Sequence, residues 1–263
     1  MQPSTSITVR DDVYYYNADS ELTSRAGNIE LDTELTLLIN LTTVLYTPEL
    51  KIFGAQYGAG IVVPISHTKL DTNINSLRVE DDVTDLGDIT FVPAMFFWNR
   101  GNFHFSLGEY IVTPTGQYDI NKNINPSLNY WSFDTNFSAT YLNLETGQDY
   151  SFNLGYIYNT ENEETNYQTG EEVHLDYMFN QFLSDTFAIG VHGFYIKQIT
   201  GDSGEGAVLG GFKGRAAGVG PAVLWMPTIK GQMISIIAKW LNEYKAENRL
   251  EGDHIFLSAA MSF

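Results

Sequence analysis

Apolar and polar residues alternate one by one along most of the chain. Between Ile29 and Thr42 the odd positions are mainly aliphatic, whereas Glu30, Asp32 and Glu34 occupy even positions. Successive side chains of a β-strand point to opposite sides, so this stretch predicts a strand with one apolar and one polar face. The same pattern recurs at residues 131–141, 150–159 and 172–179. Because helical periodicity is nearly absent, the sequence predicts an all-β protein.

Clusters of Gly, Pro, Asn and Asp divide the chain into about twelve strand-like segments. These segments lie near residues 6–18, 28–46, 51–68, 86–99, 103–113, 129–143, 148–160, 170–181, 186–199, 213–227, 232–245 and 253–263. Short and long connections alternate between them, and residues 69–85 form one of the long ones. Short turns at one rim, long loops at the other and an even strand number are typical of barrels that span the bacterial outer membrane.

We therefore predict a single domain over residues 1–263, of which residues 1–27 fit the pattern least closely. The expected fold is a transmembrane up-and-down antiparallel β-barrel of about 12 strands, with short periplasmic turns and longer extracellular loops. The alternative is a soluble β-sandwich or a lipocalin-like barrel. The apolar faces are larger and more aromatic than one small core requires, which favours the membrane barrel.

The last segment carries a second indication of this fold. Leu257, Met261 and the final Phe263 belong to an apolar series at every second position. A terminal aromatic residue in such a series resembles the assembly signal of outer-membrane barrels. We expect these three residues to be recognised by the outer-membrane assembly machinery.

The composition excludes several classes of function. Lys and Arg number 14 and Asp and Glu 32, which gives a formal net charge of −18. Such a chain is not expected to bind nucleic acid, whose phosphates require clustered Lys and Arg. Charged residues make up only 17% and aromatic residues 14%, unlike an ordinary soluble domain. Because the chain has no cysteine, disulfides, thiolate metal sites and cysteine nucleophiles are excluded.

Two further features concern the location of the protein. The first twelve residues lack the basic start and the apolar core of a signal peptide. No uninterrupted apolar run of 18 residues occurs, so a transmembrane helix is not expected. We expect the protein in the bacterial outer membrane with its signal peptide already removed; the alternative is a cytosolic location.

Seven short motifs resemble one known family in their order and spacing over about residues 85–263. They are PTGQY at 114–118, NYWSF at 129–133, GY at 155–156 with EN at 161–162, YQTGEEVHLD at 167–176, GDSG at 201–204, GVGP at 218–221 and NRLEGD at 248–253. The family is that of the outer-membrane channels named for the meta-pathway of phenol degradation, whose members are encoded near catabolic genes. The resemblance implies a barrel that helps small hydrophobic or aromatic molecules to cross the outer membrane, and it implies no enzyme.

The charged residues on the polar faces are the candidate functional residues. A charged Lys or Arg facing lipid would cost about 2–4 kcal/mol at mid-membrane, so we assign the charged set to the lumen and the substrate pathway. This set comprises Glu30, Asp32, Glu34, Asp88, Asp134, Glu172, His174, Asp176, Lys239, Glu243 and Lys245. Opposite charges across the lumen are expected to pair and narrow it.

Three motifs are also candidates for chemical sites. His174 and Asp176, with Glu172, would suit a metal or a proton acceptor, but a hydrogen-bond network in the lumen is the favoured interpretation. His104 and Ser106 are similar to the His-x-Ser pair of outer-membrane phospholipase A, yet the neighbouring apolar residues place them inward, away from lipid. The acidic stretches 80–85 and 161–164 lack the spacing of a calcium loop, so solvated loop charge is favoured over a site for cations that bridge lipopolysaccharide.

The first hypothesis is therefore a monomeric channel for passive uptake of small hydrophobic or aromatic molecules. No metal, cofactor or nucleotide-binding motif is expected, and the surroundings are outer-membrane lipid and lipopolysaccharide. The alternatives are an outer-membrane lipid-modifying enzyme and a surface barrel with a binding or structural role.

Overall fold

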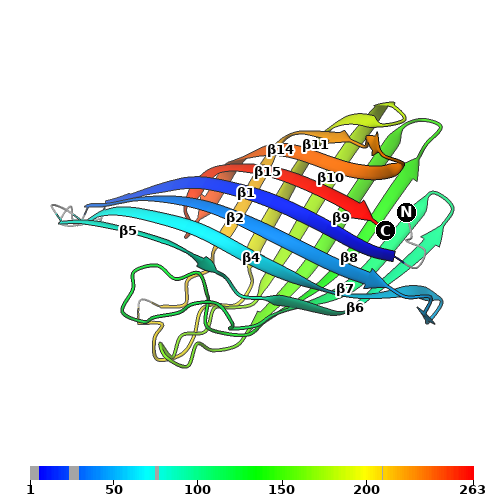
Figure 1. The fold of residues 1–263 in the computed structure, drawn as a ribbon. Coiled ribbons are helices and arrows are strands. Elements are labelled where there is room, and N and C mark those ends of the chain that lie inside the picture. Colours follow the sequence, from blue (N-terminus) through cyan, green and yellow to red (C-terminus); the bar gives the residue numbers. More distant parts are fainter. Residues whose placement is uncertain (1–5, 24–29, 75–76, 209) are drawn as a thin grey trace.

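A computed structural model describes residues 6–23, 30–74, 77–208 and 210–263, without the side chains of residues 21–23, 30, 31, 74 and 77. It forms a closed antiparallel β-barrel of 12 strands (Figure 1). The barrel strands are β1 (Ser6–Thr23), β2 (Glu30–Thr47), β4 (Ala55–Ile74), β6 (Thr90–Arg100), β7 (Phe103–Val112), β8 (Ser132–Asn143), β9 (Gln148–Asn159), β10 (Glu172–Ser184), β11 (Phe187–Gln198), β12 (Arg215–Trp225), β14 (Gln232–Glu247) and β15 (Glu251–Ser262). They follow one another in chain order, and β1 pairs with β15 to close the cylinder. The predicted fold class is confirmed.

Three more strands accompany the barrel in the described chain. β3 (Lys51–Ile52) and β13 (Thr228–Ile229) pair only with the starts of β4 and β14. β5 (Leu77–Leu86) pairs with the second half of β4, whereas β6 pairs with the first half. The prediction of a long loop at residues 69–85 is therefore wrong, because β4 continues to Ile74 and the chain then returns as β5.

The connections alternate in length, as the sequence predicts. Short turns such as residues 144–147 lie at one end of the barrel, here called the turn end. The long connections 113–131, 160–171 and 199–214 gather at the opposite end, here called the long-loop end (Figure 1). The backbone N–H of Ile7 donates to the carbonyl of Phe263 across 3.2 Å, so the first and last strands meet at the turn end.

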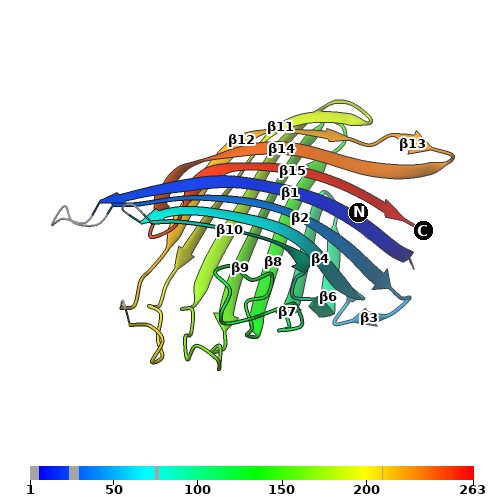
Figure 2. The ribbon, with the colours of Figure 1, turned by 60° about the vertical axis from the view of Figure 1, so that its left-hand side comes forward.

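On one side of the long-loop end, β1, β2, β4 and β5 extend beyond the other strands (Figures 1 and 2). We call residues 16–20, 32–37, 68–73 and 78–84 of these strands the projecting sheet; along one edge, residues 16–19 of β1 remain paired with residues 251–254 of β15. The register of β1 with β2, of β2 with β4 and of β4 with β5 is uninterrupted from the barrel into this sheet. Alternation along each strand therefore identifies the side that each residue faces.

The outer surface of the barrel is apolar and aromatic. Its exposed side chains include Val13, Tyr15, Leu38, Val44, Ile65, Phe103, Leu107, Phe137, Phe152, Leu154, Val191, Val223, Ile255 and Leu257. Such a band is the lipid-facing surface of outer-membrane barrels. Among the described residues no helix has the length and apolar character needed to cross a membrane.

Two carboxylates nevertheless lie on this outer surface. Asp11 accepts hydrogen bonds from Nδ2 of Asn40 (2.8 Å) and from the hydroxyl of Thr42 (3.0 Å). Glu109 accepts one from the hydroxyl of Thr135 (2.5 Å). These donors replace water at the charged oxygens and reduce the cost of placing them beside apolar surface.

Candidate functional site

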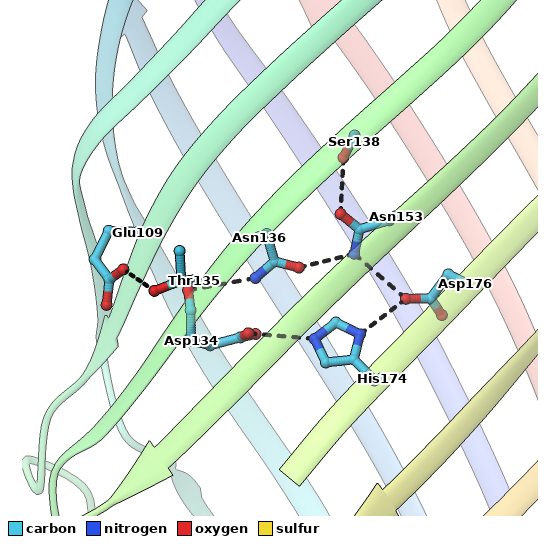
Figure 3. Close-up of polar contacts among 8 residues, drawn as sticks. All are labelled: Glu109, Asp134, Thr135, Asn136, Ser138, Asn153, His174 and Asp176. Carbon is cyan, nitrogen blue, oxygen red and sulfur yellow. Dashed lines mark hydrogen bonds and ion pairs between the residues drawn. The ribbon is translucent and has the colours of Figure 1, made fainter. Parts of the chain in front are cut away.

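The inner wall formed by β8, β9 and β10 carries a His residue between two carboxylates (Figure 3). Nε2 of His174 lies 3.2 Å from Oδ1 of Asp134, and its Nδ1 lies 3.2 Å from Oδ2 of Asp176. Gly155 faces His174 in the register of β9 with β10, and a Cβ built on it would lie 1.9 Å from Nε2 of the ring. The imidazole therefore occupies the space that a side chain at position 155 would fill.

Asn153 extends the same network toward the turn end (Figure 3). Its Oδ1 accepts a hydrogen bond from Ser138 (2.7 Å), and its Nδ2 donates to Oδ1 of Asn136 (2.8 Å). Nδ2 also reaches Oδ2 of Asp176 at 3.4 Å. The structure thus shows the hydrogen-bonded network that the sequence favours here. Within the described residues, His, Asp and Glu side chains do not gather in a metal-binding group of three.

A second polar cluster lies on the inner faces of β1, β14 and β15. Glu243, only 5% exposed, accepts hydrogen bonds from the hydroxyl of Tyr16 (3.0 Å) and the N–H of Gly252 (2.8 Å). Nε2 of His254 lies 3.1 Å from the other oxygen of Glu243. Lys239 lies four residues before Glu243 on the same face of β14, nearer the turn end. Its Nζ is 4.7 Å from the ring centroid of Phe256.

Sequence reasoning missed an ion pair of the first strand. Nε of Arg10 lies 2.8 Å from Oδ2 of Asp12, whose side chain is completely buried. Both face inward with Tyr14 and Tyr16, because the exposed Val13 occupies the opposite face. The signal was present as polar residues at alternate positions, but it falls within residues 1–27, where the pattern is least regular.

The inner face of β2 is aliphatic instead of polar. Leu38 and Val44 are exposed on the outer surface, so the odd positions of the strand face inward. We call the inward residues Ile39, Leu41 and Leu45 the aliphatic stripe, and Leu35 and Leu37 extend it into the projecting sheet. On one side β4 continues the apolar surface with Val62 and Pro64, whereas on the other side β1 carries the inward ion pair of Arg10 and Asp12.

The aliphatic stripe lies across the barrel from the His174 network. From β2 to β10 the cylinder passes through β4, β6, β7, β8 and β9 on one side and through β1, β15, β14, β12 and β11 on the other. Equal numbers of intervening strands place the two walls opposite each other. The lumen therefore has an aliphatic strip on β2 and β4 opposite a hydrogen-bonded polar wall.

This arrangement corrects the assignment of Asp32 and Glu34. Asp32 and Glu34 pair with Asn73 and Asp71 on the outer face, so they do not line the lumen. Both belong to the projecting sheet, beyond the apolar band, where an outward charge meets water and not lipid. The side chain of Glu30 lies outside the described residues. The error arose because the apolar face of this segment was assigned to lipid.

Two further assignments to the lumen are wrong. The register of β12 with β14 shifts between Ala217 and Gly218, and this bulge turns Lys245 to the outer face, with its Nζ 3.5 Å from Glu247. Asp88 belongs to the connection between β5 and β6 and binds a long loop. Its carboxylate accepts hydrogen bonds from the backbone N–H groups of Thr115 (3.1 Å), Gly116 (2.9 Å) and Leu128 (2.8 Å).

The remaining candidates face inward. The structure brings Asp134, His174 and Asp176 together, and places Lys239 and Glu243 in the second cluster. Glu172 lies 3.4 Å from Nη1 of Arg249, in the loop before β15. Three of the predicted inward residues thus form one group, while the others are distributed around the lumen.

The structure also shows where the His104–Ser106 pair, the acidic stretch 80–85 and the C-terminal apolar series lie. His104 and Ser106 pair with Thr140 and Ser138 on the inner face, away from the lipid-facing surface. The acidic stretch 80–85 forms part of β5, where Glu80 lies 3.3 Å from Lys69. Leu257 and Met261 face outward, and Phe263 is exposed at the turn end.

A closed 12-stranded barrel with an apolar outer band defines a bacterial outer-membrane β-barrel protein. The sequence matches the family described as "Putative MetA-pathway of phenol degradation" over residues 18–259, and the chain belongs to this family. The match reaches nearer the N-terminus than the motifs at 85–263. No curated protein sequence matches this chain.

Two solved structures illustrate the likeness of fold. The COG4313 outer membrane channel from Pseudomonas putida F1 is 14% identical and superimposes with a TM-score of 0.81, covering 100% of this chain and 97% of that one. The β domain of the Bordetella autotransporter BrkA is 10% identical, with a TM-score of 0.50 and coverage of 99% and 100%. These similarities show the fold of an outer-membrane β-barrel.

Proposed function

We propose that this protein is a monomeric channel for passive uptake of small hydrophobic or aromatic molecules across the outer membrane. The observation that carries the proposal is the lumen with an aliphatic stripe on β2 opposite the hydrogen-bonded wall of β8 to β10. A lumen for polar solutes needs no such apolar wall, because porin interiors are polar.

The two walls suit molecules that are poorly hydrated. An apolar solute that leaves water regains favourable contacts on the stripe at about 25 cal/mol per Å² of buried surface. The polar wall has its own hydrogen bonds satisfied, so it does not compete strongly for such a solute. Within the stripe Thr43 lies between Leu41 and Leu45. Transport requires only the concentration gradient of the solute.

The surroundings of the protein follow from the same geometry. Exposed aliphatic and aromatic side chains around the outer surface fit a single barrel embedded in outer-membrane lipid and lipopolysaccharide. Phe263, Met261 and Leu257 are proposed as the signal read by the assembly machinery. The inward position of His104 and Ser106 argues against a lipid hydrolase acting at the outer surface.

The test is a solute panel in proteoliposomes. We expect the protein to accelerate entry of toluene and 1-hexanol over protein-free vesicles, with a much smaller effect on arabinose. Ile39→Asn, on the stripe, should reduce the effect on the apolar solutes, whereas Leu38→Ala, on the outer face of the same strand, should preserve it. Faster entry of arabinose than of either apolar solute would contradict the proposal.

A further inference from the structure

The projecting sheet reverses the polarity of the barrel. In the barrel, outward side chains such as Tyr15 and Leu38 are apolar. The next outward residues of the same two strands, Asn17 and Thr36, are polar. The outward residues of the projecting sheet are polar or charged throughout: Asn17, Asp19, Asp32, Glu34, Thr36, Lys69, Asp71, Asn73, Arg78, Glu80, Asp82 and Thr84. Ion pairs join them, with Nη2 of Arg78 3.5 Å from Glu80.

The inward side of the projecting sheet contains a cluster of aliphatic side chains. Leu35 pairs with Leu70 across β2 and β4, in a row that ends at Asp81 of β5. The row that contains Leu37 continues through Thr68 to Val83 on β5. Their side chains are half-buried, so each keeps some accessible surface. Because the register is uninterrupted, this face is continuous with the aliphatic stripe inside the barrel.

The sheet also forms one side of the long-loop end, with the long loops on the other side (Figure 1). Asn123 of the loop at 113–131 reaches Oδ2 of Asp81, on the inward face of β5, at 3.4 Å. That loop is itself held by Asp88 through three backbone N–H groups. The aliphatic face is therefore directed toward the mouth of the barrel.

We propose that the inward face of the projecting sheet is a capture site for the alkyl chains of hydrophobic or amphiphilic molecules, which pass from it to the aliphatic stripe. The inference rests on the proposed function and adds a site at the long-loop end of the barrel. The side chains Leu35, Leu37, Leu70, Val79 and Val83 are aliphatic, which suits a flexible chain. From Leu35 to Leu41 the strand spans about 20 Å, room for an extended medium-length alkyl chain.

The outward charges explain why this apolar face stays accessible. Eight of the outward residues are charged, and six of these are acidic: Asp19, Asp32, Glu34, Asp71, Glu80 and Asp82. Such a surface remains hydrated and does not adsorb to lipid or to anionic headgroups. The inward face thus remains next to the mouth of the barrel.

The experiment compares two double variants at register-paired positions. Leu35→Asn with Leu70→Asn changes the inward face, and Thr36→Asn with Lys69→Asn changes the outward face one residue away. Binding of a dodecyl-chain fluorescent probe is measured for each protein in lipid nanodiscs, after folding has been verified by heat-modifiable migration. Initial uptake of 1-decanol is measured in proteoliposomes.

We expect the inward variant to bind the probe about tenfold more weakly. It should also need a higher decanol concentration for half-maximal uptake, with the single-channel conductance unchanged. Equal binding by the inward variant and the wild type, or equal loss in both variants, would overturn the capture site. If the wild type binds the probe through the inward face but does not accelerate uptake, the channel proposal fails while the capture site stands.

Discussion

Asn153 and Leu154 are adjacent residues of β9 that face opposite media. Leu154 is 56% exposed on the outer surface, whereas Asn153 belongs to the network in the lumen. The same substitution at the two positions should therefore have different results. Leu154→Lys places an ammonium group in lipid, at a cost of about 2–4 kcal/mol near the middle of the membrane.

Asn153→Lys places the same group in the lumen. It removes two short hydrogen bonds, with Ser138 and Asn136, each contributing about 1 kcal/mol net. The new ammonium comes close to Asp176, which lies 3.4 Å from the amide nitrogen of Asn153 and offsets part of this loss. The net cost should be below about 2 kcal/mol, because the two effects oppose each other.

Two measurements separate the variants. Urea titration of protein folded in lipid vesicles gives the free energy of unfolding, and the reversal potential in planar bilayers gives the ion selectivity. Leu154→Lys should lose stability and keep the selectivity of the wild type. Asn153→Lys should lose less stability and shift the selectivity toward anions. A more stable Leu154→Lys variant, or an unchanged selectivity in Asn153→Lys, would refute the assignment of faces on β9.

Three other predictions concern orientation, assembly and the His174 network. Protease added to intact cells should cut only within the long connections 114–128, 161–169 and 200–212, and cleavage at 144–147 would show the opposite orientation. Phe263→Asp should reduce the amount of heat-modifiable barrel while synthesis continues, because it removes the aromatic ring that lies at the membrane interface at the turn end. Normal assembly of this variant would contradict the proposed signal. Gly155→Ala should displace the His174 ring, since the added Cβ has no space, and should change conductance while the barrel still folds.

The faces of β8, β9 and β10 could be predicted from sequence because only one face of each strand is strongly apolar. Aromatic residues such as Phe152 and Tyr156 alternate there with Asn153 and Gly155, and the structure places them on opposite sides of the wall. In a membrane barrel the strongly apolar face is the one that meets lipid. Alternation was sufficient in these strands.

The same rule failed on β2 because both of its faces carry aliphatic residues within the barrel. Leu38 and Val44 face lipid, while Ile39 and Leu41 face the lumen. The acidic residues that suggested a lumen-facing side belong to a part of the strand outside the apolar band. Which side an acidic residue of β2 can face depends on how far the strand extends beyond the membrane. The alternation of polar and apolar residues does not reveal where the membrane ends along the strand.

Interactions between distant segments could not be predicted either. Asp88 binds N–H groups of residues 115, 116 and 128, which only the folded chain brings beside it. The bulge that turns Lys245 outward likewise depends on how β14 pairs with β12. Both features are properties of pairing geometry, to which hydrophobic periodicity is insensitive.

The change of polarity along β1, β2 and β4 also sets the depth at which the barrel sits. Tyr15 and Leu38 form the last apolar outward positions, and Asn17, Thr36 and Lys69 follow them directly. Sinking by a few ångströms would draw charged side chains into hydrocarbon, and rising by the same amount would expose apolar side chains to water. This boundary between apolar and polar outward residues lies on the side of the barrel that bears the projecting sheet. It therefore restrains tilting of the barrel as well as its vertical displacement.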